Sequence, residues 1–289
     1  MDELKFWTLI NPFGITYNPI SISQQITTAI TDKEIADNNV QERDGQFFHP
    51  DIHSSLTRDS LKGFKEEVEH QRATLKESLH SCNFLFVTLG TSIVYKWKTT
   101  NEVANNCHRM PSQEFEKLML SEDEMVKSLK TAFAKLIAQN PKIEILLTVS
   151  PIRHLRHGAI QNQRSKARLI RTCEILESNV KNCSYLPIYE LVMDELRDYR
   201  FYRQDDLVHL NLGGLEVIKD RFSTNLMDSA CFPMIRKVES WKKAFHHRVQ
   251  NPNGTEAAKF REDLRRKTQE LNKLLEGRFK DELKQLDAS

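Results

Sequence analysis

The sequence predicts an α/β protein with a parallel sheet between two layers of helices, a three-layer α/β/α arrangement. Two observations predict this fold class. The apolar runs at residues 84–88 and 143–149 have the length and the continuous hydrophobicity of buried strands. Segments with helical periodicity stand before and after each run, and strands that alternate with helices form parallel sheets.

The first elements are short. Residues 1–6 resemble the end of a helix, and residues 7–10 form an apolar stretch that we expect to be a strand. The turn Asn11-Pro12-Phe13-Gly14 ends it. A helix is expected from Asn18-Pro19, since Asn caps helices well and Pro suits their first position. The polar residues 31–58 are expected to be irregular.

The following elements alternate in type. A helix over 61–80 is expected before the strand at 84–88, and Ser121 with Glu124 predicts a capping box for a helix that ends at 139. After the strand at 143–149, a helix over 163–180 leads to a last strand at 185–188.

Two domains are expected. Residues 1–250 form the α/β domain, and residues 251–289 form a charged helical extension after the breaker Asn251-Pro252-Asn253-Gly254. A single helix is expected over 255–286. Its apolar stripe packs either on its own domain or on a partner helix, so self-association through this helix is one expectation. The stripe consists of Phe260, Leu264, Leu271, Leu275, Phe279 and Leu283.

Composition excludes several function classes. The 289 residues include 42 Lys and Arg against 40 Asp and Glu, which argues against a nucleic-acid partner or a polybasic membrane patch. No apolar run is long enough for a membrane span. The five cysteines form no C-x-x-C pair and are expected to be reduced. With no signal peptide at Met1, the expected location is the cytoplasm, unless a targeting segment precedes Met1.

The pair Asp206 and His209 carries the clearest chemical signal. The D-x-x-H spacing lets one loop present an imidazole together with the carboxylate that orients it. This is the base half of a serine-hydrolase site. Asp205 is an alternative orienting acid, but the spacing favours Asp206.

Three further loops are expected beside this pair. The segments 11–14, 90–92 and 150–154 directly follow predicted strands, and the carboxyl ends of parallel strands share one edge of a sheet. The chain has no metal-ligand spacing and no phosphate-binding glycine loop. We therefore expect neither a metal nor another cofactor.

Several longer motifs stand in one order along the chain. They are Asn11-Pro12-Phe13-Gly14-Ile15 with Tyr17-Asn18-Pro19, Thr88-Leu89-Gly90-Thr91-Ser92-Ile93-Val94-Tyr95, Val103-Ala104-Asn105-Asn106-Cys107-His108, Thr148-Val149-Ser150-Pro151-Ile152-Arg153-His154-Leu155 followed by Gln163, Ser165 and Lys166, and Asp206-Leu207-Val208-His209. Over about residues 4–245, this sequence resembles the GSCFA family, a branch of the SGNH hydrolases.

The resemblance implies hydrolysis of esters, with acetyl or short acyl groups on carbohydrate as a substrate class. It implies that His209 is the general base and that Asp206 orients it. The Gly14 N–H and the Ser92 hydroxyl, in the loop that starts at Gly90, are implied oxyanion donors. Each also has a purely structural interpretation, Gly14 as a tight-turn glycine and Ser92 as a loop serine that bonds its own backbone.

Three other residues of these motifs have implied roles. Asn11 is expected to orient the turn that contains Gly14. Arg153 and His154 are expected either to bind substrate or to support the loops of the site.

One departure from the family limits this expectation. GSCFA proteins carry an N-terminal Gly-Ser-Cys-Phe-Ala block whose Ser resembles the SGNH nucleophile, and this sequence has none. We rank three explanations: the chain lacks its first strand through truncation, it is a non-catalytic relative, or another serine such as Ser150 or Ser92 replaces the nucleophile. The first predicts an inactive chain, and the second predicts a binding or interaction module.

Overall fold

The computed structural model describes residues 1–32, 39–247 and 254–287. The contacts divide the chain into an α/β unit, Leu9–Ile218, and a helical unit that combines Met1–Thr8 with Lys219–Ser289. The boundary expected between residues 250 and 251 lies outside the described residues.

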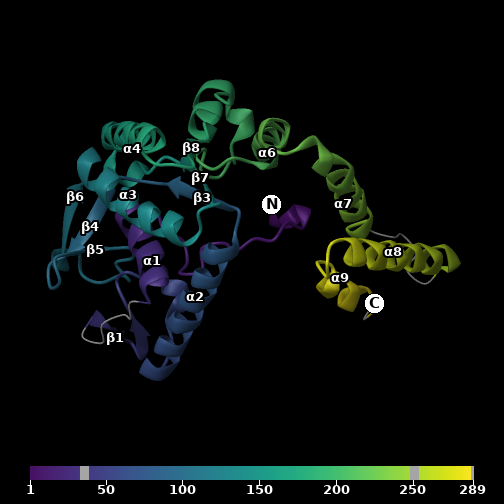
Figure 1. The fold of residues 1–289 in the computed structure, drawn as a ribbon, viewed down its shortest axis with the longest axis horizontal. Helices are drawn as coiled ribbons and strands as arrows, with labels where there is room; N and C mark the ends of the chain where they lie inside the picture. The colour runs from purple at the N-terminus through teal and green to yellow at the C-terminus, as the bar shows by residue number, and fades with distance from the viewer. Residues whose placement is uncertain (33–38, 248–253, 288–289) are drawn as a thin grey trace. The chain divides into compact units, whose positions relative to one another are not determined.

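The α/β unit contains the expected parallel sheet. Strands β3 (Phe84–Leu89), β7 (Glu144–Val149) and β8 (Cys183–Tyr185) pair in the order β3-β7-β8, and both pairings are parallel (Figure 1). Helices flank this sheet, which confirms the predicted α/β class and agrees with a three-layer α/β/α fold. The last strand begins two residues earlier than expected, and α5 (Ile188–Glu190) occupies the end of the expected strand.

The longer helices of the unit are α1 (Pro19–Thr31), α2 (Leu61–Ser81), α3 (Glu122–Gln139), α4 (Ala159–Asn179) and the first half of α6 (Leu212–Leu226). The first three begin where the sequence predicts, whereas α4 begins four residues before the expected residue 163. Asn18 caps α1 by accepting the Ser21 N–H at 2.8 Å. Ser121 and Glu124 form the predicted capping box at the start of α3. Both start signals are therefore confirmed.

The main core lies on one face of the sheet. Alternate strand residues such as Val87, Leu147 and Cys183 are buried there against α1, α3 and α4. The other face of β3 is more open, since Phe84 is 57% exposed and Thr88 is also exposed. Within the described residues, no strand pairs with the outer edge of β3. This edge therefore keeps the backbone groups with which a further strand could pair.

The structure contains a second, antiparallel sheet that the sequence did not predict. Strands β4 (Ile93–Trp97), β5 (Glu102–Ala104) and β6 (Phe115–Met119) pair antiparallel in the order β5-β4-β6. β4 begins directly after the loop 90–92, so this loop connects the parallel sheet to the antiparallel one.

The expected irregular segment 31–58 contains a hairpin. Strands β1 (Gln41–Arg43) and β2 (Gln46–Phe48) pair antiparallel. Asp44 and Gly45 connect them with φ of 52° and 71°. Positive φ at both positions is the conformation of a type I′ turn, and Asp-Gly is one of its preferred sequences. The expectation of irregular structure was wrong here because it overlooked this turn signal.

The first ten residues also differ from expectation. Only Asp2–Leu4 forms a turn of 3₁₀ helix, labelled η1, and residues 7–10 form no strand. A short apolar run becomes a strand only if a neighbouring strand accepts its hydrogen bonds. In this segment Trp7 and Ile10 remain 78% and 68% exposed.

The helical unit contains α7 (Phe232–Phe245), α8 (Thr255–Leu274) and α9 (Lys280–Asp287). The single helix expected over 255–286 is therefore wrong. Glu276 and Gly277 have φ of 50° and 90°, and the Asn272 side chain accepts the Phe279 N–H at 2.9 Å. Left-handed residues of this kind end α-helices, and the chain turns back into α9.

The apolar stripe of these helices packs inside the helical unit. Trp241 stacks edge-to-face on Phe279 with ring centroids 4.6 Å apart, and its indole N–H donates to Thr268 at 2.8 Å. Leu264 and Leu271 of the stripe are buried in the same cluster. The stripe is thus used within its own unit, and self-association through it stays a prediction.

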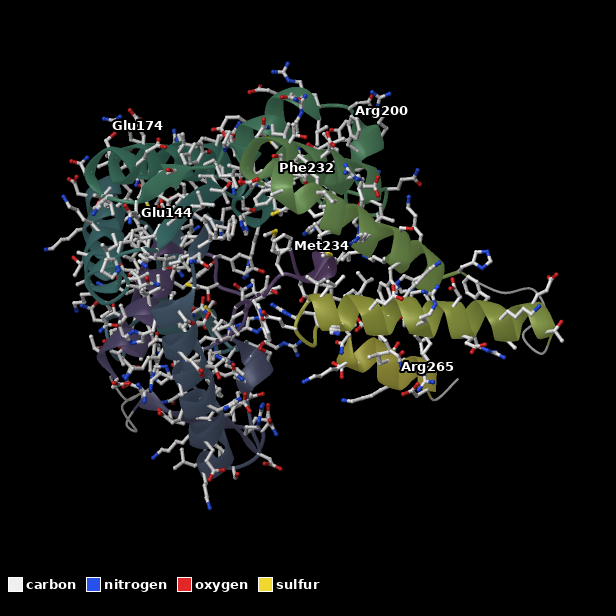
Figure 2. The ribbon with its side chains drawn as sticks, turned by 45° about the vertical axis from the view of Figure 1, so that its right-hand side comes forward. Glu144, Glu174, Arg200, Phe232, Met234 and Arg265 are labelled. Atoms are coloured by element: carbon white, nitrogen blue, oxygen red, sulfur yellow. The ribbon has the colours of Figure 1, made fainter. Side chains whose placement is uncertain are left out.

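Polar contacts tie the parts of the helical unit together. Glu3 pairs with Lys242 of α7 at 2.6 Å, and the Arg278 guanidinium donates to the Phe6 carbonyl at 3.1 Å. Arg265 of α8, labelled in Figure 2, donates to Asp287 of α9 at 2.7 Å. The segment Met1–Thr8 is therefore packed against the helices at the other end of the chain.

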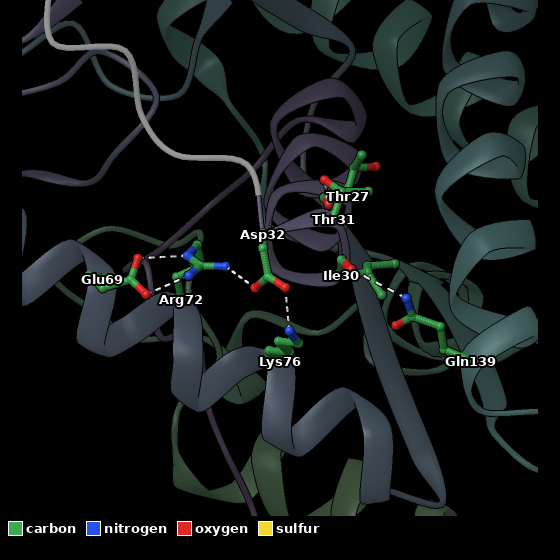
Figure 3. A network of polar contacts seen from close by, with 8 residues as sticks. All are labelled: Thr27, Ile30, Thr31, Asp32, Glu69, Arg72, Lys76 and Gln139. Atoms are coloured by element: carbon green, nitrogen blue, oxygen red, sulfur yellow. Dashed lines mark hydrogen bonds and ion pairs between the residues drawn. The ribbon is translucent and has the colours of Figure 1, made fainter.

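A charged network joins α1 to α2 (Figure 3). Asp32 ends α1 with a left-handed φ of 51° and accepts hydrogen bonds from Arg72 and Lys76 of α2. The hydrogen bond from Lys76 is the main reason that the pKa of Asp32 lies below its usual value, followed by that from Arg72. A surface hollow lies here, but it includes none of the predicted site residues, and both cations already have acidic partners, Asp32 for both and Glu69 for Arg72.

The cysteines are reduced in this fold. All five are free, and Cys173 of α4 and Cys183 of β8 are buried in the main core. Burial raises the pKa of each of these two thiols to about 12. Over the described ranges, no helix has the length and apolar character that crossing a membrane demands.

Candidate functional site

The loop that carries Asp206 and His209 is closed at its base. The Arg203 N–H donates to the His209 carbonyl at 2.8 Å, and Tyr202 bridges to Leu210. Asn211 then caps α6, since its side-chain oxygen accepts the Gly214 N–H at 3.1 Å. The loop is therefore short, and backbone hydrogen bonds hold its two ends together immediately before α6.

His209 and Asp206 form the contact that their spacing suggests. The His209 Nδ1 lies 2.7 Å from the Asp206 Oδ2. The other carboxylate oxygen accepts the backbone N–H groups of Val208 and His209 at 2.8 and 2.9 Å. Asp205 is occupied by Arg203, whose Nε donates to it at 3.0 Å. Asp206, and not Asp205, is the acid that holds the imidazole.

The electrostatics of this pair suit a general base. The His209 backbone N–H, then the Val208 N–H and the His209 ring keep the pKa of the Asp206 carboxyl far below its usual value. An ionised Asp206 accepts the Nδ1–H of a neutral imidazole, which leaves Nε2 unprotonated. The His209 side chain is 53% exposed, so a reactant can approach Nε2 from solvent.

Arg153 links this loop to the loop after β7. Its guanidinium Nη2 donates to the Leu207 carbonyl at 2.6 Å and lies over the ring of Tyr202, 5.9 Å from the ring centroid. Leu207 has a φ of 53°, a conformation that is strained for a residue other than glycine. The contact with Arg153 holds this carbonyl in place, so Arg153 supports the loop of His209.

The other site loops join through Tyr17. The Tyr17 carbonyl accepts the Gly90 N–H at 2.7 Å and the Thr91 N–H at 3.1 Å. The Tyr17 ring packs edge-on against His154, with centroids 5.6 Å apart. Contacts therefore run from the His209 loop through Arg153 and His154 to the Gly90 loop. The structure thus joins the loops of His209, Arg153 and Gly90, whereas the Gly14 turn contacts His53 instead.

Lys166 holds the Gly90 loop and the Ser150 loop by hydrogen bonds to their backbones. It lies on α4, is 1% exposed, and its Nζ donates to the carbonyls of Gly90 and Ser150 at 2.6 Å each. These carbonyls directly follow β3 and β7. Burial lowers the pKa of Lys166 to about 8.

Ser165, the residue before Lys166, holds Ser92 by two hydrogen bonds. Its hydroxyl oxygen accepts the Ser92 N–H at 2.8 Å and the Ser92 hydroxyl at 3.1 Å. Sequence reasoning noted Ser165 and Lys166 only as members of a motif. The available signal was their place on the inward stripe of a helix, in register with Leu169 and Cys173.

The expected oxyanion donors are already hydrogen-bonded. The Ser92 side chain is completely buried and donates to Ser165. The Gly90 N–H donates to Tyr17, and the Gly14 N–H donates to the Asn11 carbonyl of its own turn at 2.7 Å. In this conformation each of these groups supports a loop, which favours their structural interpretation.

The turn at Gly14 is fitted closely to His53. Gly14 has a φ of 79°, and a Cβ built on it would lie 2.3 Å from the His53 Cβ. The His53 N–H donates to the Phe13 carbonyl at 3.2 Å. Asn11 also has a positive φ, 44°, and is exposed. Glycine is needed at position 14 for both its backbone conformation and its missing side chain.

We therefore expect Gly14→Ala to destabilise the protein by about 2 kcal/mol or more, through backbone strain and the clash with His53. Urea unfolding followed by circular dichroism measures this. The matched control is Gly45→Ala, since Gly45 also has a positive φ of 71° but no atom within 4 Å of its added Cβ. An equal loss of stability in both variants would contradict the role of His53.

The remaining polar candidates have local partners. The Ser150 hydroxyl accepts the Ile152 N–H at 3.3 Å and so stabilises its own turn. The His154 N–H donates to Asn162 at 2.9 Å. Burial, followed by the charges of Lys166 and His157, lowers the pKa of His154. Across the described ranges, no three His, Cys, Asp or Glu side chains could together hold a metal ion.

Comparison with known proteins gives one match. The model of the GSCFA family matches residues 1–222, which include all the candidate site residues named above. No curated protein and no solved structure matches the chain.

Proposed function

Because the chain belongs to the GSCFA family, a branch of the SGNH hydrolases, we propose that its site is that of an ester hydrolase in which His209 is the general base and Asp206 orients it. The observation that carries this proposal is the 2.7 Å contact between the His209 Nδ1 and the Asp206 carboxylate on an exposed, anchored loop. Acetyl or short acyl esters of carbohydrate are the proposed substrate class.

The proposed chemistry starts with a serine hydroxyl. His209 takes its proton at Nε2 while the serine oxygen attacks the ester carbonyl. Asp206 holds the imidazole by Nδ1 and stabilises the imidazolium. The proton then passes from Nε2 to the leaving alcohol, and the same base activates the water that releases the acyl group.

The nucleophile is the part of the site that this chain does not supply. Within the described residues, no serine hydroxyl contacts the His209 ring. Ser92 and Ser165 are buried and bonded to each other, and Ser150 stabilises a turn. The serine of the Gly-Ser-Cys-Phe-Ala block of the family is the proposed nucleophile.

The open edge of β3 supports this proposal. A parallel strand that pairs there would end at the same edge as Gly90 and Ser150, where the His209 loop is joined through Arg153. The residue after such a strand would enter the site. The serine's own backbone N–H is the simplest oxyanion donor, since the Gly14 and Gly90 N–H groups are engaged.

The test compares two forms of the protein. The 289-residue chain is expected to hydrolyse p-nitrophenyl acetate no faster than buffer with free imidazole. A form extended ahead of Met1 by a strand that carries Gly-Ser-Cys-Phe-Ala is expected to hydrolyse it with a burst of p-nitrophenol, the sign of an acyl-enzyme. Equal activity in the two forms would refute the proposal about the nucleophile.

The second candidate function is a non-catalytic binding module. The engaged N–H groups of Gly14 and Gly90 favour it, since they leave no oxyanion donor at the expected positions. This candidate predicts that the extended form binds a carbohydrate ester without turnover. Mass spectrometry of the ester after incubation separates the two functions.

A further inference from the structure

Positive charge is concentrated on one segment of the α/β unit. Between Glu144 and Glu174 the sequence has six Lys or Arg and no Asp or Glu, although the whole chain carries a net charge of only +2. The segment runs from β7 through the following loop into α4. Residues 151–158 of that loop follow the strand end at which the site lies.

Several of these cations are already used. Arg171 pairs with Glu174 at 2.6 Å. Lys166 and Arg168 donate to backbone carbonyls, and Arg153 donates to the Leu207 carbonyl. Arg156 and Arg164 are both exposed, and neither forms an ion pair with any residue that the structure describes. Arg156 is the one that lies in the loop after β7.

A lysine from the second sheet joins Arg156. Lys117 of β6 lies opposite Tyr95 of β4, and the Tyr95 hydroxyl lies 3.4 Å from the His157 Nε2. Lys117 is exposed and, among the described ranges, has no acidic partner. Arg156, His157 and Lys117 therefore meet on one surface, which we name the cationic surface.

The charges on this surface act on one another. Burial lowers the pKa of His157, and the charges of Lys117 and Arg156 lower it further. Like charges held together without a counter-charge favour binding of an anion. Gly158 gives α4 no side-chain cap, so the backbone N–H groups of the first turn are further donors beside the same residues.

The cationic surface belongs to the loop that supports His209. Three residues before Arg156, Arg153 holds the Leu207 carbonyl, and His154 packs on Tyr17 beside the Gly90 loop. A ligand on the cationic surface would thus contact the same loop that lines the proposed hydrolase site.

We propose that Arg156, His157 and Lys117 bind an oxyanion group, a phosphate, sulfate or carboxylate, carried by the substrate at a position away from its ester. The guanidinium presents a planar pair of donors, and the ammonium and imidazole add point contacts, a donor set that suits these groups. That the anion belongs to a substrate rests on the proposed hydrolase function. The anion site itself does not.

The first test measures binding on the 289-residue chain. Inorganic phosphate, sulfate and galacturonate are titrated at constant ionic strength, and backbone amide shifts of residues 155–160 are followed by NMR. Saturable shifts are expected for at least one oxyanion, and the ion with the highest affinity identifies the group. The absence of saturable shifts with all three would overturn the proposal.

The second test removes the charges. The double variant Lys117→Gln/Arg156→Gln is expected to bind the anion roughly tenfold more weakly, at about threefold for each exposed charge. The control Lys142→Gln/Lys181→Gln removes the same charge from exposed lysines before β7 and β8, at the opposite edge of the sheet, and is expected to bind as the unchanged chain does. Equal loss in the two variants would show a general charge effect and overturn the site.

Two further measurements complete the design. In the variant Lys117→Gln/Arg156→Gln, the pKa of His157 measured by NMR is expected to rise, which shows that the fold and the position of His157 persist. The variant His209→Ala is expected to bind the anion with unchanged affinity. Anion binding without ester hydrolysis would thus support this site while the hydrolase proposal fails, and the reverse result would overturn only this site.

Discussion

Replacing His209 by alanine is expected to lower the rate of p-nitrophenyl acetate hydrolysis by the form extended with Gly-Ser-Cys-Phe-Ala roughly 10³- to 10⁴-fold. The physical reason is the geometry of the imidazole. Its Nδ1 is held by Asp206 at 2.7 Å, so Nε2 is the free proton acceptor. No neighbouring group replaces it, since Asp206 is oriented toward the imidazole and Asp205 is paired with Arg203.

Two variants make this result specific to the site. His70→Ala removes another exposed histidine, on α2, and is expected to leave the rate unchanged. Asp206→Asn keeps the shape of the acid but loses its charge, and a large loss of rate is expected with little change in KM. If His209→Ala retained more than a tenth of the rate, His209 would not be the base.

Replacing Lys166 by methionine is expected to have the largest effect on stability, a loss of about 3 kcal/mol in the free energy of unfolding. Lys166 is 1% exposed and is a donor to the carbonyls of Gly90 and Ser150. Methionine has a similar length but no donor, so both carbonyls lose this partner in a buried region. Urea unfolding at pH 7 measures the loss.

The pH dependence distinguishes the lost amine from lost packing. The pKa of Lys166 is lowered to about 8 in the folded protein, against about 10.4 for an unfolded lysine. The unfolded chain therefore binds more protons between these values, and stability contributed by this group rises as the pH increases from 8 to 10.4, by at most about 3 kcal/mol. This rise is expected to disappear in Lys166→Met.

Lys135 offers the matched control for this experiment. It is an exposed lysine of α3 with no ion pair in the described parts of the chain. The variant Lys135→Met is expected to keep the stability and the pH dependence of the unchanged chain. The stability difference between the unchanged chain and Lys166→Met is therefore the quantity to follow, because the titration of Cys173 and Cys183 is common to both. A difference that stays constant from pH 8 to 10.4 would refute the assignment of this titration to Lys166.

Local signals allowed much of the fold to be predicted from the sequence. Asn18, Ser121 and Glu124 cap helices through contacts within three residues, so their pattern is visible in the chain itself. The strands at 84–88 and 143–149 are visible because each is a continuous apolar run of the length typical of strands. The antiparallel sheet β5-β4-β6 was missed because its pairing depends on distant residues such as Tyr95 and Lys117.

In the candidate site too, contacts between residues close in sequence could be predicted, and contacts between distant residues could not. The contact between Asp206 and His209 follows from a spacing of three residues, and the sequence could predict it. The partners of Gly14, Gly90 and Ser92 could not be predicted, since His53, Tyr17 and Ser165 reach them from distant parts of the chain. A glycine or serine motif shows which residue stands in a loop, but not where its N–H or hydroxyl points.

The two core thiols have a consequence for where such a fold can persist. Cys173 and Cys183, whose pKa values are raised to about 12, remain protonated at neutral pH and out of reach of solvent oxidants. Thiolate is the form that peroxides and disulfide reagents attack. The packing around α4 and β8 is therefore expected to persist in oxidising as well as in reducing surroundings.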